Sequence, residues 1–191
     1  MQGFSLAATF LLTAAASTAQ WTPPAVAITH VEGDVYAGSQ QVLKADFVVK
    51  ESAVVRTEKG RAEIRFDRGD RMFLGENSSV RVQGAIEILT GSVVVISGEV
   101  GPALTCRGTV HLSDAGIFRF DVHRVLDENF CKVRVYKGAA GAQMPSFVWI
   151  LTPGKMVDLG SCGDHTPRDE FKVEETDAFD LWSRQRAGAR P

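Results

Sequence analysis

Apolar and polar residues alternate through the segment from residue 55 to residue 75, and this alternation constrains the fold more than any other feature of the sequence. The apolar members are Ala62, Ile64 and Phe66, and the polar members between them are Arg61, Glu63 and Arg65. A period of two is typical of a β-strand with one face buried and the other in solvent. Gly60 and Gly69 stand where we expect the chain to reverse. The segment therefore predicts consecutive strands joined by turns.

The same rhythm of short apolar runs and turn residues continues along the chain, at a spacing of roughly 8 to 12 residues. The β-branched runs at 47–49, 93–96 and 133–136 favour strands, and glycine turns such as Thr90-Gly91 are expected to separate them. The sequence thus predicts an all-β fold of many short antiparallel strands. A sandwich, a barrel and an irregular β-solenoid-like module all fit this pattern.

One short helix is predicted near the C-terminus, from Thr176 to Arg186. Thr176 is expected to cap it, Asp177 lies in its first turn, and basic residues lie near its end. Phe179 and Trp182 are about one turn apart, so we expect them to pack the helix back against the strands.

The first nineteen residues, 1–19, form a predicted signal peptide. An apolar run extends from Phe4 to Ala16, and the small residues Ser17-Thr18-Ala19 suit cleavage near Ala19-Gln20. The start lacks a basic residue, which leaves a retained N-terminal anchor or a misassigned start codon as alternatives. No cysteine follows the run to carry a lipid, and no later segment is apolar enough to span a membrane. We therefore expect a periplasmic or extracellular protein.

The rest of the chain divides into three parts. Residues 20–27 are a predicted linker because Pro23 and Pro24 hold the chain extended. Residues 28–160 are the expected β-domain, and residues 161–191 are a C-terminal loop and helix tail. The 21 basic and 23 acidic residues are interspersed and give a net charge of -2, which argues against a nucleic-acid partner.

Three cysteines follow the predicted signal peptide: Cys106, Cys131 and Cys162. In an exported protein they are possible disulfide partners, and the odd one stays unpaired or bonds another chain. The sequence leaves the pairing open, and three reduced thiols are the alternative. The spacings of 25 and 31 residues lack the short C-x-x-C motif of a metal site.

His111, Ser113 and Asp114 are close in the sequence, but they straddle a predicted hairpin turn and lack the arrangement of a catalytic triad. The remaining histidines are scattered without metal-ligand spacing; they are His30, His123 and His165. The phosphate-loop, nucleophile-elbow and zinc-protease motifs are all missing. The sequence therefore predicts no catalytic residue, no cofactor, no metal site and no enzyme.

Other motifs have ordinary structural interpretations. Arg68-Gly69-Asp70 matches the integrin-binding tripeptide, yet its charged neighbours indicate a hairpin turn. Asn77-Ser78-Ser79 is formally a glycosylation acceptor and is interpreted as a turn. Arg61, Glu63 and Arg65 are interpreted as a solvated strand face. The tryptophans are expected to anchor the core or the tail, unless two exposed ones form a sugar-stacking platform; they are Trp21, Trp149 and Trp182.

Several strand and glycine motifs follow one another in a fixed order. They are Val31-x-Gly33-x-Val35, Gly60-Arg61-Ala62-Glu63-Ile64, Leu74-Gly75-Glu76-Asn77-Ser78-Ser79-Val80, Ile88-Leu89-Thr90-Gly91-Ser92-Val93, Gly116-x-Phe118-Arg119-Phe120-Asp121, Val133-x-Val135-Tyr136-Lys137-Gly138 and Asp177-Ala178-Phe179-Asp180-Leu181-Trp182. The ordered set resembles the FecR-like domain over about residues 28 to 186. This is an extracytoplasmic β-module known from transmembrane signalling regulators.

The resemblance implies a non-enzymatic exported module that binds a protein or a cell-envelope component, with a role in envelope sensing or signalling. We expect binding through a sheet face or by strand addition at an exposed edge. The regulators also carry a cytoplasmic anti-sigma segment and a membrane helix that this sequence is not expected to have, so a signalling role does not follow from the β-module alone. The alternatives are a structural envelope protein that forms homo-oligomers, with the odd cysteine linking chains, and a carbohydrate- or peptidoglycan-binding domain.

Overall fold

The computed structural model describes residues 26–67, 69–83, 85–98, 103–125, 128–160 and 169–188, which form fifteen strands and one helix. In chain order these are β1 (Val26–Ala37), β2 (Gln40–Gln41), β3 (Phe47–Val48), β4 (Val54–Phe66), β5 (Arg71–Leu74), β6 (Ser79–Gln83), β7 (Ala85–Ser97), β8 (Ala103–Thr105), β9 (Thr109–Leu112), β10 (Gly116–Val125), β11 (Glu128–Lys137), β12 (Ala140–Met144), β13 (Phe147–Leu151), β14 (Lys155–Leu159), β15 (Asp169–Glu170) and α1 (Ala178–Ala187). The predicted all-β class is confirmed.

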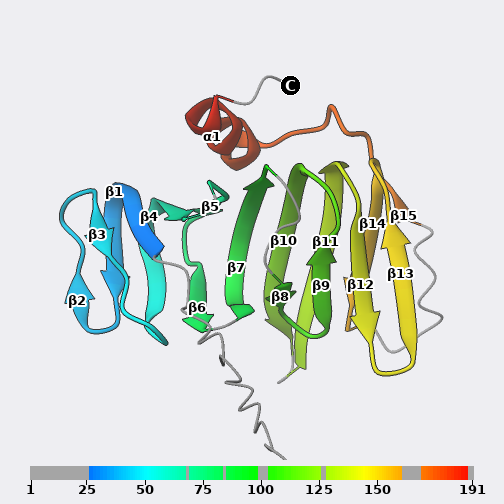
Figure 1. Ribbon diagram of the computed structural model, residues 1–191, viewed down its shortest axis with the longest axis horizontal. Coiled ribbons are helices and arrows are strands. Elements are labelled where there is room, and N and C mark those ends of the chain that lie inside the picture. Colours follow the sequence, from blue (N-terminus) through cyan, green and yellow to red (C-terminus); the bar gives the residue numbers. More distant parts are fainter. Residues whose placement is uncertain are drawn as a thin grey trace, which may run out of the picture.

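The strands form one continuous sheet that folds over into two layers (Figure 1). The helix-side layer contains, in spatial order, β3, the start of β1, the end of β4, β5, the end of β7, β10, β11, β14 and β15. The open layer contains β2, the end of β1, the start of β4, β6, the start of β7, β8, β9, β12 and β13. Among the described strands, β7 and β8 form the one parallel pair. The arrangement is a β-sandwich.

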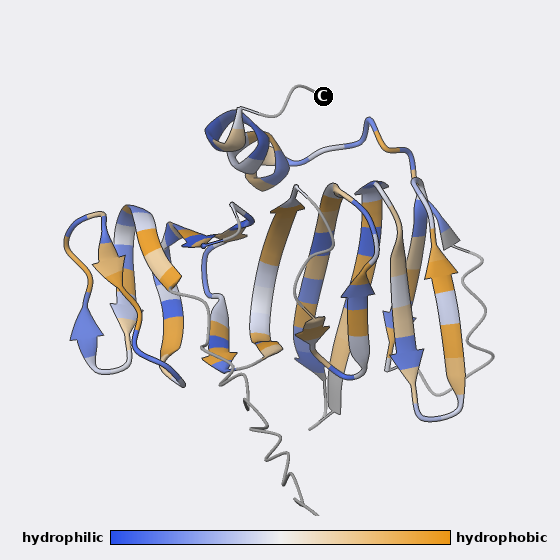
Figure 2. Cartoon of the chain, viewed as in Figure 1, coloured by the Kyte–Doolittle hydropathy of each residue, from blue (hydrophilic) through white to orange (hydrophobic). Residues whose placement is uncertain are grey.

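Apolar side chains from both layers fill the space between them. Ala62, Ile64 and Phe66 face this core, as the alternation predicted. The largest other side chains that it buries completely include Met72, Phe118, Phe120, Leu104 and Leu151. Figure 2 shows the corresponding bands of apolar and polar residues along the strands. Removal of this apolar surface from water is the main favourable contribution to folding.

The long strands β1, β4 and β7 run from one layer into the other, and β4 shows how the crossing is made. The β4 positions that face the core are odd at Val55 and even from Ala62 to Phe66, which is the effect of one inserted residue. Gly60 lies opposite Gly33 of β1, and a Cβ at Gly60 would lie 2.3 Å from the carbonyl oxygen of Glu32. The prediction that the chain reverses at Gly60 is therefore wrong, because β4 passes through this glycine and continues into the other layer.

Gly91 has the same role in β7. Its φ of +88° lies in the left-handed region, and a Cβ there would lie 2.2 Å from Oγ of Ser78. The β7 positions that face the core are even up to Ile88 and odd from Val93 onward. The predicted turn at Thr90-Gly91 is therefore wrong, and one strand replaces the two that were expected.

A second apolar cluster lies on the outer face of the helix-side layer, beneath α1. Its buried members on the sheet are Phe73, Val94, Ile117 and Tyr136. Phe179 and Trp182 of α1 pack against them, so the predicted packing of these two residues is confirmed. The ring of Trp182 meets that of Phe73 edge-on at 5.7 Å.

The same helix explains why one charged strand position is not solvated. Glu63 was expected in a solvated face with Arg61 and Arg65, but it is only 3% exposed. Nε of Arg186, in the last turn of α1, donates to Glu63 at 3.1 Å. The strand alternation was correct, but it gave no information about what covers the outer face.

The N-terminal cap of α1 also differs from the prediction. Asp177 caps the helix in place of Thr176, since its carboxylate accepts the backbone N–H of Asp180 at 2.9 Å. The Asp180 carboxylate in turn accepts the backbone N–H of Asp177 at 3.3 Å, which completes a capping box. Gly188 ends the helix in the left-handed conformation.

A disulfide joins Cys106, after β8 in the open layer, to Cys131 on β11 in the helix-side layer. Cys162, the predicted signal peptide of residues 1–19 and most of the predicted linker lie outside the described residues. β1 begins at Val26, within the predicted linker, and β15 pairs with β14, so part of the predicted tail extends the sheet. In the part of the chain that the structure describes, no helix has the length and apolar character needed to cross a membrane.

Candidate functional site

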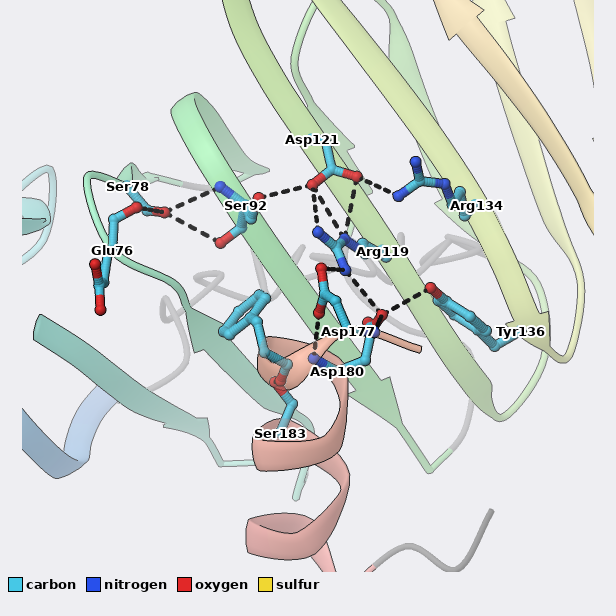
Figure 3. Close-up of polar contacts among 11 residues, drawn as sticks. Glu76, Ser78, Ser92, Arg119, Asp121, Arg134, Tyr136, Asp177, Asp180 and Ser183 are labelled. Atoms are coloured by element: carbon cyan, nitrogen blue, oxygen red, sulfur yellow. Dashed lines mark hydrogen bonds and ion pairs between the residues drawn. The ribbon is translucent and has the colours of Figure 1, made fainter. Parts of the chain in front are cut away.

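The outer face of the helix-side layer carries a polar network centred on Arg119 of β10 (Figure 3). Arg119 is 8% exposed and donates through Nε to both oxygens of Asp121, at 3.0 and 3.1 Å. Its Nη1 donates to Asp177 at 2.7 Å and to Asp180 at 2.8 Å, both from α1 and its cap. Burial alone would lower the pKa of Arg119, but the three carboxylates outweigh burial and raise it.

The network extends sideways over three strands. Asp121 also accepts from Nη1 of Arg134 on β11 at 2.7 Å and from Oγ of Ser92 on β7 at 2.7 Å. The hydroxyl of Tyr136 donates to Asp180 at 3.0 Å. Burial, reinforced by the negative charge of Asp180, raises the pKa of Tyr136 to about 12, so the hydroxyl keeps its proton at neutral pH.

These contacts describe an anchor for α1 better than a reactive centre. Each of the three carboxylates is held by Arg119, and the Tyr136 proton is already donated to Asp180. The network itself lines a depression of about 440 Å³. Five network residues contribute to its wall, together with neighbours such as Met156, Phe171 and Glu175; the five are Arg119, Arg134, Tyr136, Asp177 and Asp180. The arrangement offers no nucleophile activated by a neighbouring base, which acyl or phosphoryl transfer would require.

The edges of the two layers differ in length and charge. β2, β3 and β15 are each two residues long, and Glu170 of β15 is paired with Lys155. The stretch of β1 between β2 and β3 carries His30, Glu32 and Asp34. Short strands and charges such as these protect an edge from pairing with another chain.

β13 lacks both protections. It is five residues long, contains no charged residue, and pairs with β12 alone among the described strands. Val148 is 68% exposed and Ile150 is 78% exposed. The cause lies in the neighbouring strand, because Ile150 lies opposite Gly141, which has no side chain to cover it. Among the described strands, β13 is therefore a neutral, apolar edge strand.

The residues that resembled a hydrolase triad are not assembled into one. His111 is an exposed residue on β9, whereas Ser113 and Asp114 lie in the short connection between β9 and β10. The backbone N–H of Ser113 donates to the Ala139 carbonyl at 2.9 Å, as a turn residue does. In the described ranges, no hydrogen bond joins these three side chains.

The other histidines are apart from one another. His30 on β1 forms a hydrogen bond with Glu32 at 2.9 Å, and His123 on β10 stacks on Phe130 at 5.5 Å. Within the described residues, no group of three potential metal ligands is present. His165 lies outside these residues.

The remaining motifs are structural as well. Asp70 of the integrin-like tripeptide is buried and accepts a hydrogen bond from Ser97 at 2.8 Å, so it is not displayed, while Arg68 lies outside the described residues. Asn77 of the glycosylation-like motif lies in the turn between β5 and β6, where its φ is +53°, as the turn interpretation predicted. Trp149 on β13 stacks with Phe147 at 5.6 Å, and neither residue lines the depression beside Arg119. Trp21 lies outside the described residues.

Sequence reasoning did not single out the Arg119 network or the open edge. Arg119 and Asp121 share the outer face of β10, so a polar pair on that face was visible, but its partners on α1 lie 58 and 61 residues away. The run Phe147–Leu151 indicated a strand. A continuous apolar run does not say whether the strand is central or at an edge.

No family model matches this chain, and no curated protein matches it. Two crystal structures of a proposed anti-sigma factor from Parabacteroides distasonis ATCC 8503 have a similar fold, with TM-scores of 0.50 and 0.51 and 15% sequence identity. Each match covers 61% of this chain and 59% of the other. At this identity the likeness concerns the fold alone.

Proposed function

We propose that this chain is a non-enzymatic, exported β-module of the FecR-like type that binds an extended segment of a protein by strand addition at β13. The observation that carries the proposal is the contrast between β13 and the other sheet edges. The others are two residues long or charged, whereas β13 offers five uncharged residues. Edges left long and apolar are templates for pairing.

Strand addition divides recognition between backbone and side chains. The backbone of β13 supplies hydrogen bonds to any extended segment, and the exposed side chains of Val148 and Ile150 select apolar residues at alternate positions of the added strand. Because β13 has no charged side chain, it cannot form ion pairs with a highly charged partner strand. The ligand is thus an extended, apolar segment of a protein.

Export to the periplasm or beyond rests on two features. The apolar run from Phe4 to Ala16 followed by small residues has the form of a signal peptide. The disulfide between Cys106 and Cys131 persists in an oxidising compartment. The fold shared with a proposed anti-sigma factor makes envelope signalling proteins the first partners to examine, although the match spans 59% of that protein.

The test compares two ends of the same sandwich. Val48 on β3 is 68% exposed and Ile150 on β13 is 78% exposed, so lysine at either position adds one charge at an exposed site, at opposite ends of the strand order. A photo-crosslinking residue at position 148 should capture a protein in the envelope fraction, and Ile150→Lys should abolish that capture. Val48→Lys should leave it intact. Capture that survives Ile150→Lys, or no capture at position 148, would overturn the proposal.

The intact mass of the purified protein tests export separately. Loss of residues 1–19 supports it, and an uncleaved chain recovered from the cytoplasm contradicts it.

A further inference from the structure

We propose that Cys106 is a site of reversible thiol–disulfide exchange, at which a low-molecular-weight thiol with peptide groups, such as glutathione, replaces Cys131 as the partner of the Cys106 sulfur. The site goes beyond strand addition at β13, because it uses the disulfide and a depression to which no residue of β13 contributes.

The depression lies where the bend between β8 and β9 meets the end of β12, and its volume is about 450 Å³. Cys106 forms part of its wall, together with three polar residues of the outer face of the open layer, which are Thr105, Thr109 and Gln143. The alternate positions of these strands face the core. Pockets that bind small molecules have volumes of about 300 to 1,000 Å³, so the depression can hold a small thiol.

The two sulfurs of the disulfide differ in accessibility. Cys106 is half-buried and belongs to the wall of the depression, whereas Cys131 is only 1% exposed and is paired with strands on both sides. A thiolate exchanges with a disulfide by attacking one of its two sulfurs, so access decides which sulfur reacts. A thiol from solvent therefore attacks Cys106, and Cys131 is the leaving group.

The exchange needs no further oxidant or reductant. The incoming thiolate forms a bond to the Cys106 sulfur with its own electron pair, and the bond between Cys106 and Cys131 breaks with its pair on Cys131. The incoming sulfur is thus oxidised and the Cys131 sulfur is reduced. Cys131 takes up the proton that the incoming thiol lost, and a buried thiol packs as a small apolar group. Attack by Cys131 on the mixed disulfide restores the original bond.

The position of Cys106 in the chain allows the exchange without loss of strand pairing. β8 ends at Thr105 and β9 begins at Thr109, so Cys106 lies in the bend between them. Its backbone N–H donates to the Gly108 carbonyl at 3.2 Å, within the bend itself. The side chain can therefore turn toward the depression while β8 and β9 stay paired.

The wall of the depression suits a thiol that carries peptide groups. Thr105 and Thr109 each offer a hydroxyl, and Gln143 offers an amide that both donates and accepts. Within the described residues, none of these three side chains has a hydrogen-bond partner. The amide and carboxylate groups of glutathione can form hydrogen bonds with them.

The test uses the mature chain with Cys162→Ser, so that the third cysteine takes no part. The folded protein is incubated with reduced glutathione and sampled over time, and the remaining thiols are alkylated after denaturation in acid. Intact mass and peptide mapping should show one glutathione on Cys106 and one alkyl group on Cys131. Glutathione on Cys131 in place of Cys106 would overturn the proposal. So would the lack of an adduct at every time point under conditions that modify the denatured chain.

A pair of glutamine variants tests the role of the depression. Gln143→Tyr narrows the depression and should slow the attachment of glutathione by about tenfold or more. Gln83→Tyr is the matched control, since Gln83 is also an exposed glutamine on a strand of the open layer but does not line the depression. It should leave the rate unchanged. Equal rates in the two variants, with circular dichroism showing both folded, would overturn the proposal.

Discussion

Arg119 on β10 donates a 2.8 Å charged hydrogen bond to Asp180 on α1, across 61 residues of sequence. Both side chains are more than nine-tenths buried. The pair therefore connects the C-terminal helix to the middle of the helix-side layer, and its partners Asp121 and Asp177 share the same guanidinium. The packing of α1 against the helix-side layer should therefore depend on the Arg119 side chain.

Replacement of Arg119 by alanine should lower the free energy of unfolding by about 3 kcal/mol, because it leaves a buried carboxylate without its charge partner. Chemical denaturation measures the loss, and limited proteolysis should show earlier cleavage near α1. Arg65→Ala, at an exposed outward position of β4, is the control and should change stability by less than about 0.5 kcal/mol. Equal effects of the two substitutions would refute the role of Arg119 as an anchor.

Acid should loosen α1 through Asp177. Burial alone would raise the pKa of Asp177, but the Asp180 amide and the Arg119 guanidinium outweigh burial and lower it. A carboxyl group whose pKa is lower when folded stabilises the protein above its unfolded pKa, near 4, and this contribution is lost as the pH falls through the folded value. Unfolding free energies measured from pH 7 down to pH 3 should therefore decline. In Asp177→Asn the decline should be smaller, and an unchanged profile would contradict this assignment.

Gly60→Ala should be among the most destabilising glycine substitutions. The added Cβ would lie 2.3 Å from one backbone atom and 2.6 Å from another, and neither can move without disrupting the β1–β4 pairing. We expect a loss of more than about 2 kcal/mol, in the range of overpacked cores. Gly141→Ala on β12 is the matched control, since no atom lies within 4 Å of its added Cβ. Similar melting temperatures for the two variants would show that the crossing tolerates a side chain.

Removal of the disulfide should destabilise the sandwich without changing its fold. Cys106 and Cys131 are separated by 25 residues, and release of a loop of this size costs about 3 kcal/mol in the chain-entropy treatment. The double variant Cys106→Ser with Cys131→Ser should therefore melt at a lower temperature, as should the reduced wild-type protein. Cys162→Ser should melt like the wild type under oxidising conditions. A loss of stability in Cys162→Ser instead would point to a different pairing.

The local sequence pattern predicted the strands well where burial of one strand face determines which positions are apolar. Ala62, Ile64 and Phe66 alternate because the core is on one side, and this signal needs only neighbours two residues apart. The burial of Glu63 on the opposite face was not predictable in that way. It depends on α1, whose Arg186 is 123 residues further along the chain.

Glycine was the ambiguous signal. Glycine occurs both where the chain reverses and where a strand bends, because both conformations need a position without a Cβ. Gly60 and Gly91 lie at bends within a strand. Only the register of the neighbouring strands distinguishes such a bend from a reversal of the chain. The edge position of β13 was likewise hidden, since the order of strands in space is not contained in any single run of residues.

The passage of β1, β4 and β7 through both layers has a consequence for how the molecule comes apart. In a sandwich whose two sheets are joined only by loops, the sheets can separate while each one keeps its own strands paired. In this protein three strands contribute backbone to both layers. Neither layer can therefore separate while the other keeps all of its inter-strand hydrogen bonds. The β-domain should accordingly unfold in one cooperative step, with identical transitions reported by far-UV circular dichroism and by the fluorescence of Trp149 in a variant without the other two tryptophans.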